Sequence, residues 1–68
     1  MEVVVNGEQR EFEGEMKVVE MLKALGIDPG MPGIAVAVNL SVVRKGEWED
    51  VVVKNGDEVD VITARQGG

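Results

Sequence analysis

The chain has no cysteine and no histidine among its 68 residues. These absences exclude disulfides, thiol nucleophiles, imidazole bases and every usual zinc ligand set. They argue against an enzyme that supplies its own reactive side chains. A chain without cysteine can fold in a reducing or an oxidising compartment. The absence of cysteine suits a reducing compartment, and we expect the protein in the cytoplasm.

Basic residues and long apolar runs are also few. Thirteen acidic against seven basic residues give a net charge of −6, which repels nucleic-acid phosphates and anionic lipid headgroups. No apolar run approaches the roughly 20 residues of a membrane span, and Met1-Glu2 does not resemble the start of a signal peptide. We therefore expect a soluble protein, monomeric when free, with no nucleic-acid or membrane partner, whose partners offer a basic surface.

Aromatic residues are limited to Phe12 and Trp48. The length allows one small domain, so its core must consist mainly of aliphatic, often β-branched side chains. Such side chains lose little rotamer entropy when they are buried. Tryptophan often anchors protein partners, but we expect Trp48 to fill the edge of this small core instead.

Alternating and β-branched segments predict several strands. Asn6-Gly7 favours a two-residue hairpin turn between residues 2–5 and residues 9–13. Further strands are predicted at residues 34–38 and 40–43, both central in the sheet, at 51–53, and at 58–64 after the turn Asn55-Gly56-Asp57. In the last strand, alternation places Val59, Val61 and Thr63 on one face and Asp60, Ile62 and Ala64 on the other.

One helix is predicted over residues 17–25, where four apolar residues recur at helical spacing, namely Val18, Met21, Leu22 and Leu25. Gly26 follows at the position of a helix-ending glycine. A single helix can bury its apolar stripe only against the sheet. The predicted fold class is therefore α+β, a mixed sheet of four to five strands with one helix across one face. The sheet residues expected to face the helix are Val3, Val5, Phe12, Val36, Val38, Val59 and Val61.

Four motifs, with the order of the elements, resemble the ThiS family of sulfur carriers in the ubiquitin-like β-grasp superfamily: AVAVN (35–39), VVRKGEW (42–48), NGDEV (55–59) and TARQGG (63–68). The resemblance covers essentially the whole chain. Its most specific part is the GDEV strand start followed by a di-glycine. Two features depart from the family pattern, because Leu40 stands where a glycine or polar residue is usual and no Ser or Thr begins the helix. The layout implied is a β-grasp domain over residues 1–64 and a flexible C-terminal tail over 65–68.

The resemblance implies a carrier that is not an enzyme. In the family, a separate ThiF/MoeB-like enzyme uses ATP to adenylate the C-terminal carboxylate. The adenylate becomes a thiocarboxylate, which donates sulfur during formation of the thiamin thiazole ring, so a thiazole synthase is the second implied partner. By this resemblance Gly67 and Gly68 are the sulfur-carrying C-terminus, with no catalytic residue, no metal and no bound cofactor in the carrier.

This chemistry explains the glycines. AMP on the Gly68 carboxylate is a good leaving group that a sulfur nucleophile can displace, and the activating enzyme supplies the groups that neutralise phosphate charge. Because they lack Cβ, Gly67 and Gly68 can pass through a narrow channel and approach the nucleotide closely.

The partner is expected on the outward face of the last strand. Alternation exposes Ile62 and Ala64 there, with Ala35 and Ala37 beside them and with Glu58 and Asp60 at the edge. Arg65 and Gln66 are expected at the mouth of the partner's channel. The predicted partner-binding residues are Asp60, Ile62, Ala64, Arg65 and Gln66.

Three other functions remain open at this stage. The small subunit of molybdopterin synthase shares the fold and the di-glycine. A ubiquitin-like modifier would be joined through Gly68 to lysines of other proteins. A plain β-grasp interaction domain would not need the di-glycine. A calcium loop is excluded by the spacing of Asp57, Glu58 and Asp60, and the glycines match no nucleotide-binding motif.

Overall fold

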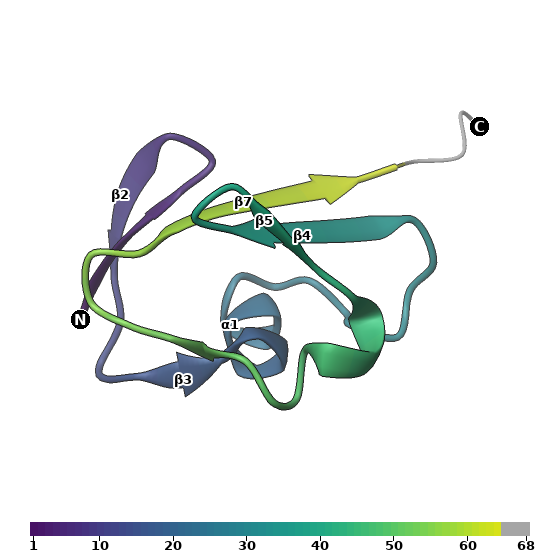
Figure 1. Cartoon of the computed structure of the whole chain (residues 1–68), viewed down its shortest axis with the longest axis horizontal. Helices are drawn as coiled ribbons and strands as arrows, with labels where there is room; N and C mark the ends of the chain where they lie inside the picture. The colour runs from purple at the N-terminus through teal and green to yellow at the C-terminus, as the bar shows by residue number, and fades with distance from the viewer. Residues whose placement is uncertain (65–68) are drawn as a thin grey trace.

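The computed structural model describes residues 1–64, which form a five-stranded mixed sheet with a helix across one face (Figure 1). In spatial order the strands are β2 (Glu8–Glu11), β1 (Glu2–Val5), β7 (Glu58–Thr63), β4 (Ile34–Val38) and β5 (Ser41–Val43). β1 and β7 run parallel, and the other neighbours are antiparallel. The helix is α1 (Val18–Ala24). The predicted α+β class is confirmed.

The β1–β2 hairpin turns at Asn6-Gly7, as the sequence predicts, with φ of 51° and 81°. Asn6 has a second role. Its backbone N–H donates to the Val59 carbonyl at 2.9 Å, and its Oδ1 accepts from the Val61 N–H at 2.7 Å. The Asn6 side-chain oxygen thus takes the place of the backbone carbonyl that a longer β1 would offer to Val61. It adds one hydrogen bond to the β1–β7 ladder beyond the end of β1.

Helix α1 buries Val18, Met21 and Leu22 against the sheet. Its first turn is closed without Ser or Thr, because Glu20 Oε1 accepts from the Lys17 N–H at 2.9 Å. At its end Gly26 has φ of 81°, and the Ile27 N–H donates to the Leu22 carbonyl at 2.9 Å, a Schellman arrangement. With seven residues, α1 is short, and within residues 1–64 no helix has the length and apolar character needed to span a membrane.

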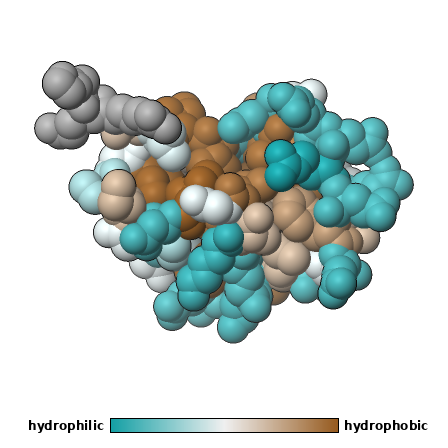
Figure 2. All heavy atoms as spheres, turned by 180° about the vertical axis from the view of Figure 1, so that it is seen from behind, coloured by the Kyte–Doolittle hydropathy of each residue, from teal (hydrophilic) through white to brown (hydrophobic). Residues whose placement is uncertain are grey.

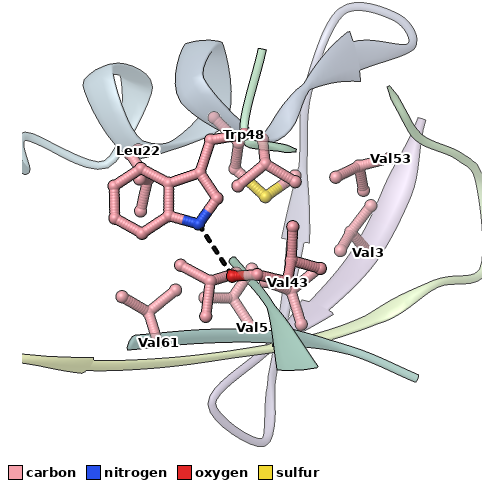
Figure 3. Packing of buried hydrophobic residues seen from close by; sticks show 11 residues of the cluster. Val3, Val5, Leu22, Val43, Trp48, Val53 and Val61 are labelled. Carbon is pink, nitrogen blue, oxygen red and sulfur yellow. Dashed lines mark hydrogen bonds between the residues drawn. The ribbon is translucent and has the colours of Figure 1, made fainter. Parts of the chain in front are cut away.

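A second, two-stranded sheet joins β3 (Met16–Lys17) and β6 (Val52–Val53) beside the helix. A 3-10 turn, η1 (Lys45–Glu47), precedes Trp48. The Trp48 ring is buried, and its Nε1–H donates to the Val43 carbonyl at 3.0 Å (Figure 3). Its predicted place in the core is confirmed, and its one polar group is satisfied there.

The core differs from the prediction in a few positions. Phe12 and Val38 are only half-buried, whereas Val43 and Val53 are buried together with Trp48. The second strands of the two hairpins are shorter than predicted, as β2 covers Glu8–Glu11 and β5 begins at Ser41.

The prediction that residues 40–43 form a central strand is wrong. β5 lies at the edge of the sheet, next to β4 alone. Asn39 and Leu40 make the two-residue turn before it, with φ of 50° and 70°. Leu40 is 83% exposed, so no burial offsets the cost of a left-handed leucine, which is about 1–2 kcal/mol.

Replacing Leu40 with glycine should therefore stabilise the fold. Relief of left-handed strain exceeds the extra backbone entropy of glycine, so the free energy of unfolding should rise by about 0.5–1 kcal/mol in urea denaturation followed by circular dichroism. The control is Ala35→Gly within β4, which should lower it by a similar amount. A Leu40→Gly protein less stable than the parent would contradict this reading of the turn.

Candidate functional site

The candidate site begins at the C-terminal end of β7. Asp60 and Ile62 lie in this strand, and Ala64 follows it directly. The other residues predicted for the site are Arg65, Gln66, Gly67 and Gly68, which lie outside the described residues. The described part of the candidate site therefore ends at Ala64.

The faces of β7 match the predicted alternation in the body of the strand. Val59 and Val61 are buried towards the helix, whereas Ile62 is 66% exposed on the opposite face. Across the β4–β7 ladder Ala35 lies opposite Ile62, and Ala37 lies opposite Asp60. Ile62 therefore has a small side chain beside it, which leaves its own side chain accessible.

A third strand adds to this face. Val42 on β5 lies opposite Ala37 and is 78% exposed. We call Ala35, Ala37, Val42 and Ile62 the outer apolar patch. Val42 was not among the predicted site residues, because residues 40–43 were expected to form a central strand and no face of that strand was assigned.

Acidic groups border the outer apolar patch on β7. Asp60 is half-buried and pairs with Ala37, and Glu58 is the next residue on the same face. Such a surface, apolar with carboxylates at one side, suits a partner whose contact surface is apolar with a basic border.

Backbone contact at Gly33 positions the end of β7. The Ala64 N–H donates to the Gly33 carbonyl at 2.7 Å. Gly33 has φ of 81°, and a Cβ there would lie 2.8 Å from the Ala64 carbonyl oxygen. Gly33 was predicted only as part of a linker. The structure shows that it permits the close approach of two backbones, and no local sequence signal identifies Ala64 as its neighbour.

Two of the sequence motifs meet at the start of β7. The Asn39 Nδ2 donates to Asp57 Oδ1 at 3.0 Å, and Asn39 Oδ1 accepts from the Glu58 N–H at 2.9 Å. The other carboxylate oxygen of Asp57 accepts from the Lys54 N–H at 2.8 Å. These polar side chains organise turns. In the described part of the chain, no three His, Cys, Asp or Glu side chains are placed to hold a metal ion.

Within residues 1–64 no polar or charged side chain is buried. The described residues therefore provide a surface for contact with another molecule and the end of strand β7. β7 is held by β4 up to Ala64, the outer apolar patch lies on one face of it, and the residues predicted to react come next in the chain.

Comparison with known proteins identifies relatives along the whole chain. A family model described as "ThiS family" matches residues 3–68. The sulfur carrier protein ThiS of Thermus thermophilus is 35% identical over 66 residues, which are 97% of this chain and 98% of that protein. A thiazole synthase of Paramagnetospirillum magneticum is 37% identical over 68 residues. This chain spans only 20% of the length of that thiazole synthase.

Solved structures show the same fold. The crystal structure of the thiamine biosynthesis protein ThiS from Geobacter metallireducens has a TM-score of 0.83 and 28% identity, and the match covers all of both chains. The solution structure of a thiamine biosynthesis protein from the same organism has a TM-score of 0.81, with 28% identity, and covers 100% of this chain and 88% of that chain.

The contact between Gly33 and Ala64 can be tested with a matched pair of substitutions. Gly33→Ala adds left-handed strain of about 1–2 kcal/mol and also forces Cβ against the Ala64 carbonyl. Gly56→Ala adds only the strain, because Gly56 has φ of 87° and open space around it. Both substitutions should lower the free energy of unfolding, and Gly33→Ala should lower it by more. Only Gly33→Ala should speed hydrogen exchange at the Ala64 amide. Equal effects of the two would contradict a specific role for Gly33.

Proposed function

This chain belongs to the ThiS family, and from that premise we propose that it carries sulfur for thiamine thiazole synthesis as a thiocarboxylate on Gly68. The observation that supports the proposal most strongly is that the family match extends through Gly67 and Gly68. The Thermus relative named as a sulfur carrier matches over 97% of this chain. In this role the protein is a small carrier and another protein performs the catalysis.

The proposed chemistry takes place in two steps. A separate enzyme transfers AMP from ATP to the Gly68 carboxylate and releases pyrophosphate. Hydrosulfide, delivered by the sulfur source, then attacks the acyl carbon, the bond to AMP breaks, and loss of a proton leaves the thiocarboxylate. The carrier contributes no reacting side chain to these steps. Its contribution is a terminal carboxylate on residues without Cβ, which can reach a nucleotide in an enclosed site.

We propose two partners, an ATP-dependent adenylating enzyme and a thiazole synthase, and we place the reaction in the cytoplasm. Support for the second partner comes from the Paramagnetospirillum relative. A protein named thiazole synthase contains a stretch similar to the whole of this chain and is about five times its length, since the match covers 20% of it. In that relative, a segment similar to this chain is part of a protein named as a thiazole synthase, and this supports a functional contact between the two kinds of protein.

The outer apolar patch is the proposed docking surface for these partners, with Asp60 and Ala64 beside it. Ile62 and Val42 are exposed by 66% and 78%, and full burial of such a side chain is worth about 1.5–3 kcal/mol. That gain can offset part of the cost of ordering tail residues, which is about 1–2 kcal/mol for each residue fixed. Arg65 and Gln66 then lie at the mouth of the partner's channel.

The first test is a mass measurement. The chain is incubated with ATP, a sulfur source and the adenylating enzyme of its own organism, and intact-protein mass spectrometry should show oxygen replaced by sulfur at Gly68. A chain lacking Gly67 and Gly68 is the control and should stay unchanged. Absence of the product with active enzyme would count against the proposal, and conjugates to lysines of cellular proteins would favour a modifier instead.

The second test concerns docking. Ile62→Ser should weaken binding to the adenylating enzyme or to the thiazole synthase by about tenfold or more, because a buried isoleucine is worth about 1.5–3 kcal/mol. Calorimetric titration measures the change. Val52→Ser is the matched control, since Val52 is 40% exposed on β6, outside the main sheet, and it should bind normally. Equal binding by the Ile62→Ser protein would remove the outer apolar patch from the interface.

A further inference from the structure

The two edges of β7 are paired to different extents. On the β4 side, Asn39 donates to the Glu58 carbonyl and Ala64 donates to the Gly33 carbonyl, and the register between these positions is continuous. Hydrogen-bonded positions in an antiparallel ladder alternate. Residues 58, 60, 62 and 64 therefore direct their backbone groups to β4, and residues 59, 61 and 63 direct theirs to the opposite edge.

On that opposite edge β1 stops before β7 does. β1 pairs with β7 only at Glu58 and Val59, and the Asn6 side chain then takes the Val61 N–H. Beyond this point the Val61 carbonyl and the N–H and carbonyl of Thr63 have no hydrogen-bond partner among residues 1–64. We call the backbone of 61–63 on this side the open edge. Thr63 is exposed to solvent.

A groove of about 240 Å³ lies beside the open edge. Its apolar lining comes from the sheet and from Leu25 and Ile27, which follow helix α1, and Glu8 and Arg10 on β2 supply charged groups. Val61 and Thr63 of β7 line the groove on the side of the open edge. Seen from behind, the molecule shows apolar side chains gathered across the middle of its surface, with hydrophilic ones around them (Figure 2).

We propose that the protein which accepts the Gly68 tail adds an extended segment to the open edge as a further strand of the sheet. This inference rests on the proposed function and names how the same site is recognised. Unpaired backbone groups at strand spacing are satisfied by another extended backbone. Because side chains alternate along a strand, such a segment places an apolar side chain in the groove over Leu25 and Ile27.

The position of the open edge explains what the added strand does. Thr63 lies five residues before Gly68 in the chain. With Gly33 bonded to Ala64 on one edge and the partner bonded to Thr63 on the other, the end of β7 is held from both sides. The direction in which the tail enters the partner is then fixed before the carboxylate reacts, which favours productive geometry.

Hydrogen exchange at single amides tests the pairing directly. In the free chain the Thr63 amide should exchange fast and the Val61 amide slowly, because Val61 already donates to Asn6. In the complex with thiazole synthase, or with the adenylating enzyme and ATP, exchange at Thr63 should slow by at least tenfold. Protection of Thr63 in the free chain at high concentration would indicate pairing between two copies and would overturn the proposal.

The outcomes separate this inference from the function on which it rests. A complex that yields the thiocarboxylate while Thr63 stays unprotected overturns the added strand and leaves the carrier function intact. Failure to bind either enzyme and to form a thiocarboxylate overturns both.

A variant pair gives an independent measurement. Thr63→Pro removes the N–H that the partner would accept but no bond to β4, and proline is tolerated at an unpaired strand edge. It should weaken binding by about tenfold, whereas Thr63→Val keeps the N–H and should weaken binding by clearly less. If Thr63→Pro does not fold, a synthetic chain N-methylated at Thr63 replaces it. Equal binding by the folded N–H-deficient chain and by Thr63→Val would overturn the proposal.

Discussion

The antiparallel ladder between β4 and β7 determines both the core and the proposed site. One face of its paired residues buries Val36, Val59 and Val61, and the other exposes Ala35 and Ile62. A shift of one residue in this register would exchange the two faces, so the same register determines both the core and the proposed docking surface. Burial of the small core stabilises this register, and the register in turn determines where β7 ends.

Local patterns were sufficient to predict the helix, the first hairpin and the faces of β7. Helical spacing located α1, Asn6-Gly7 located the turn, and alternation placed Ile62 outside. What could not be read from the sequence depends on contacts between distant residues. β3 is only two residues long, too short for any periodicity, and the role of Gly33 follows from Ala64, 31 residues away by number. The strand predicted over residues 40–43 began one residue too early, because the sequence does not distinguish an apolar residue in a left-handed turn from an apolar residue in a strand.

The polar residues of the motifs prove to be structural. Asn39 and Asp57 belong to two motifs that carried the family resemblance. In the fold their side chains bond to each other, and Asn39 also accepts from the N–H of Glu58, the first residue of β7. Their joint presence therefore reports the β-grasp architecture. The proposed chemistry lies elsewhere, at Gly67 and Gly68, so the residues that indicate the fold differ from those proposed to carry sulfur.

The parallel pairing of β1 with β7 has a consequence for synthesis. β1 is made first, yet its central neighbour begins at Glu58, near the end of the chain. Contacts of such large sequence separation close slowly and only after the intervening chain exists. On the ribosome the sheet can therefore be completed only after β7 has been made, and a translation product that stops before Glu58 lacks the central strand.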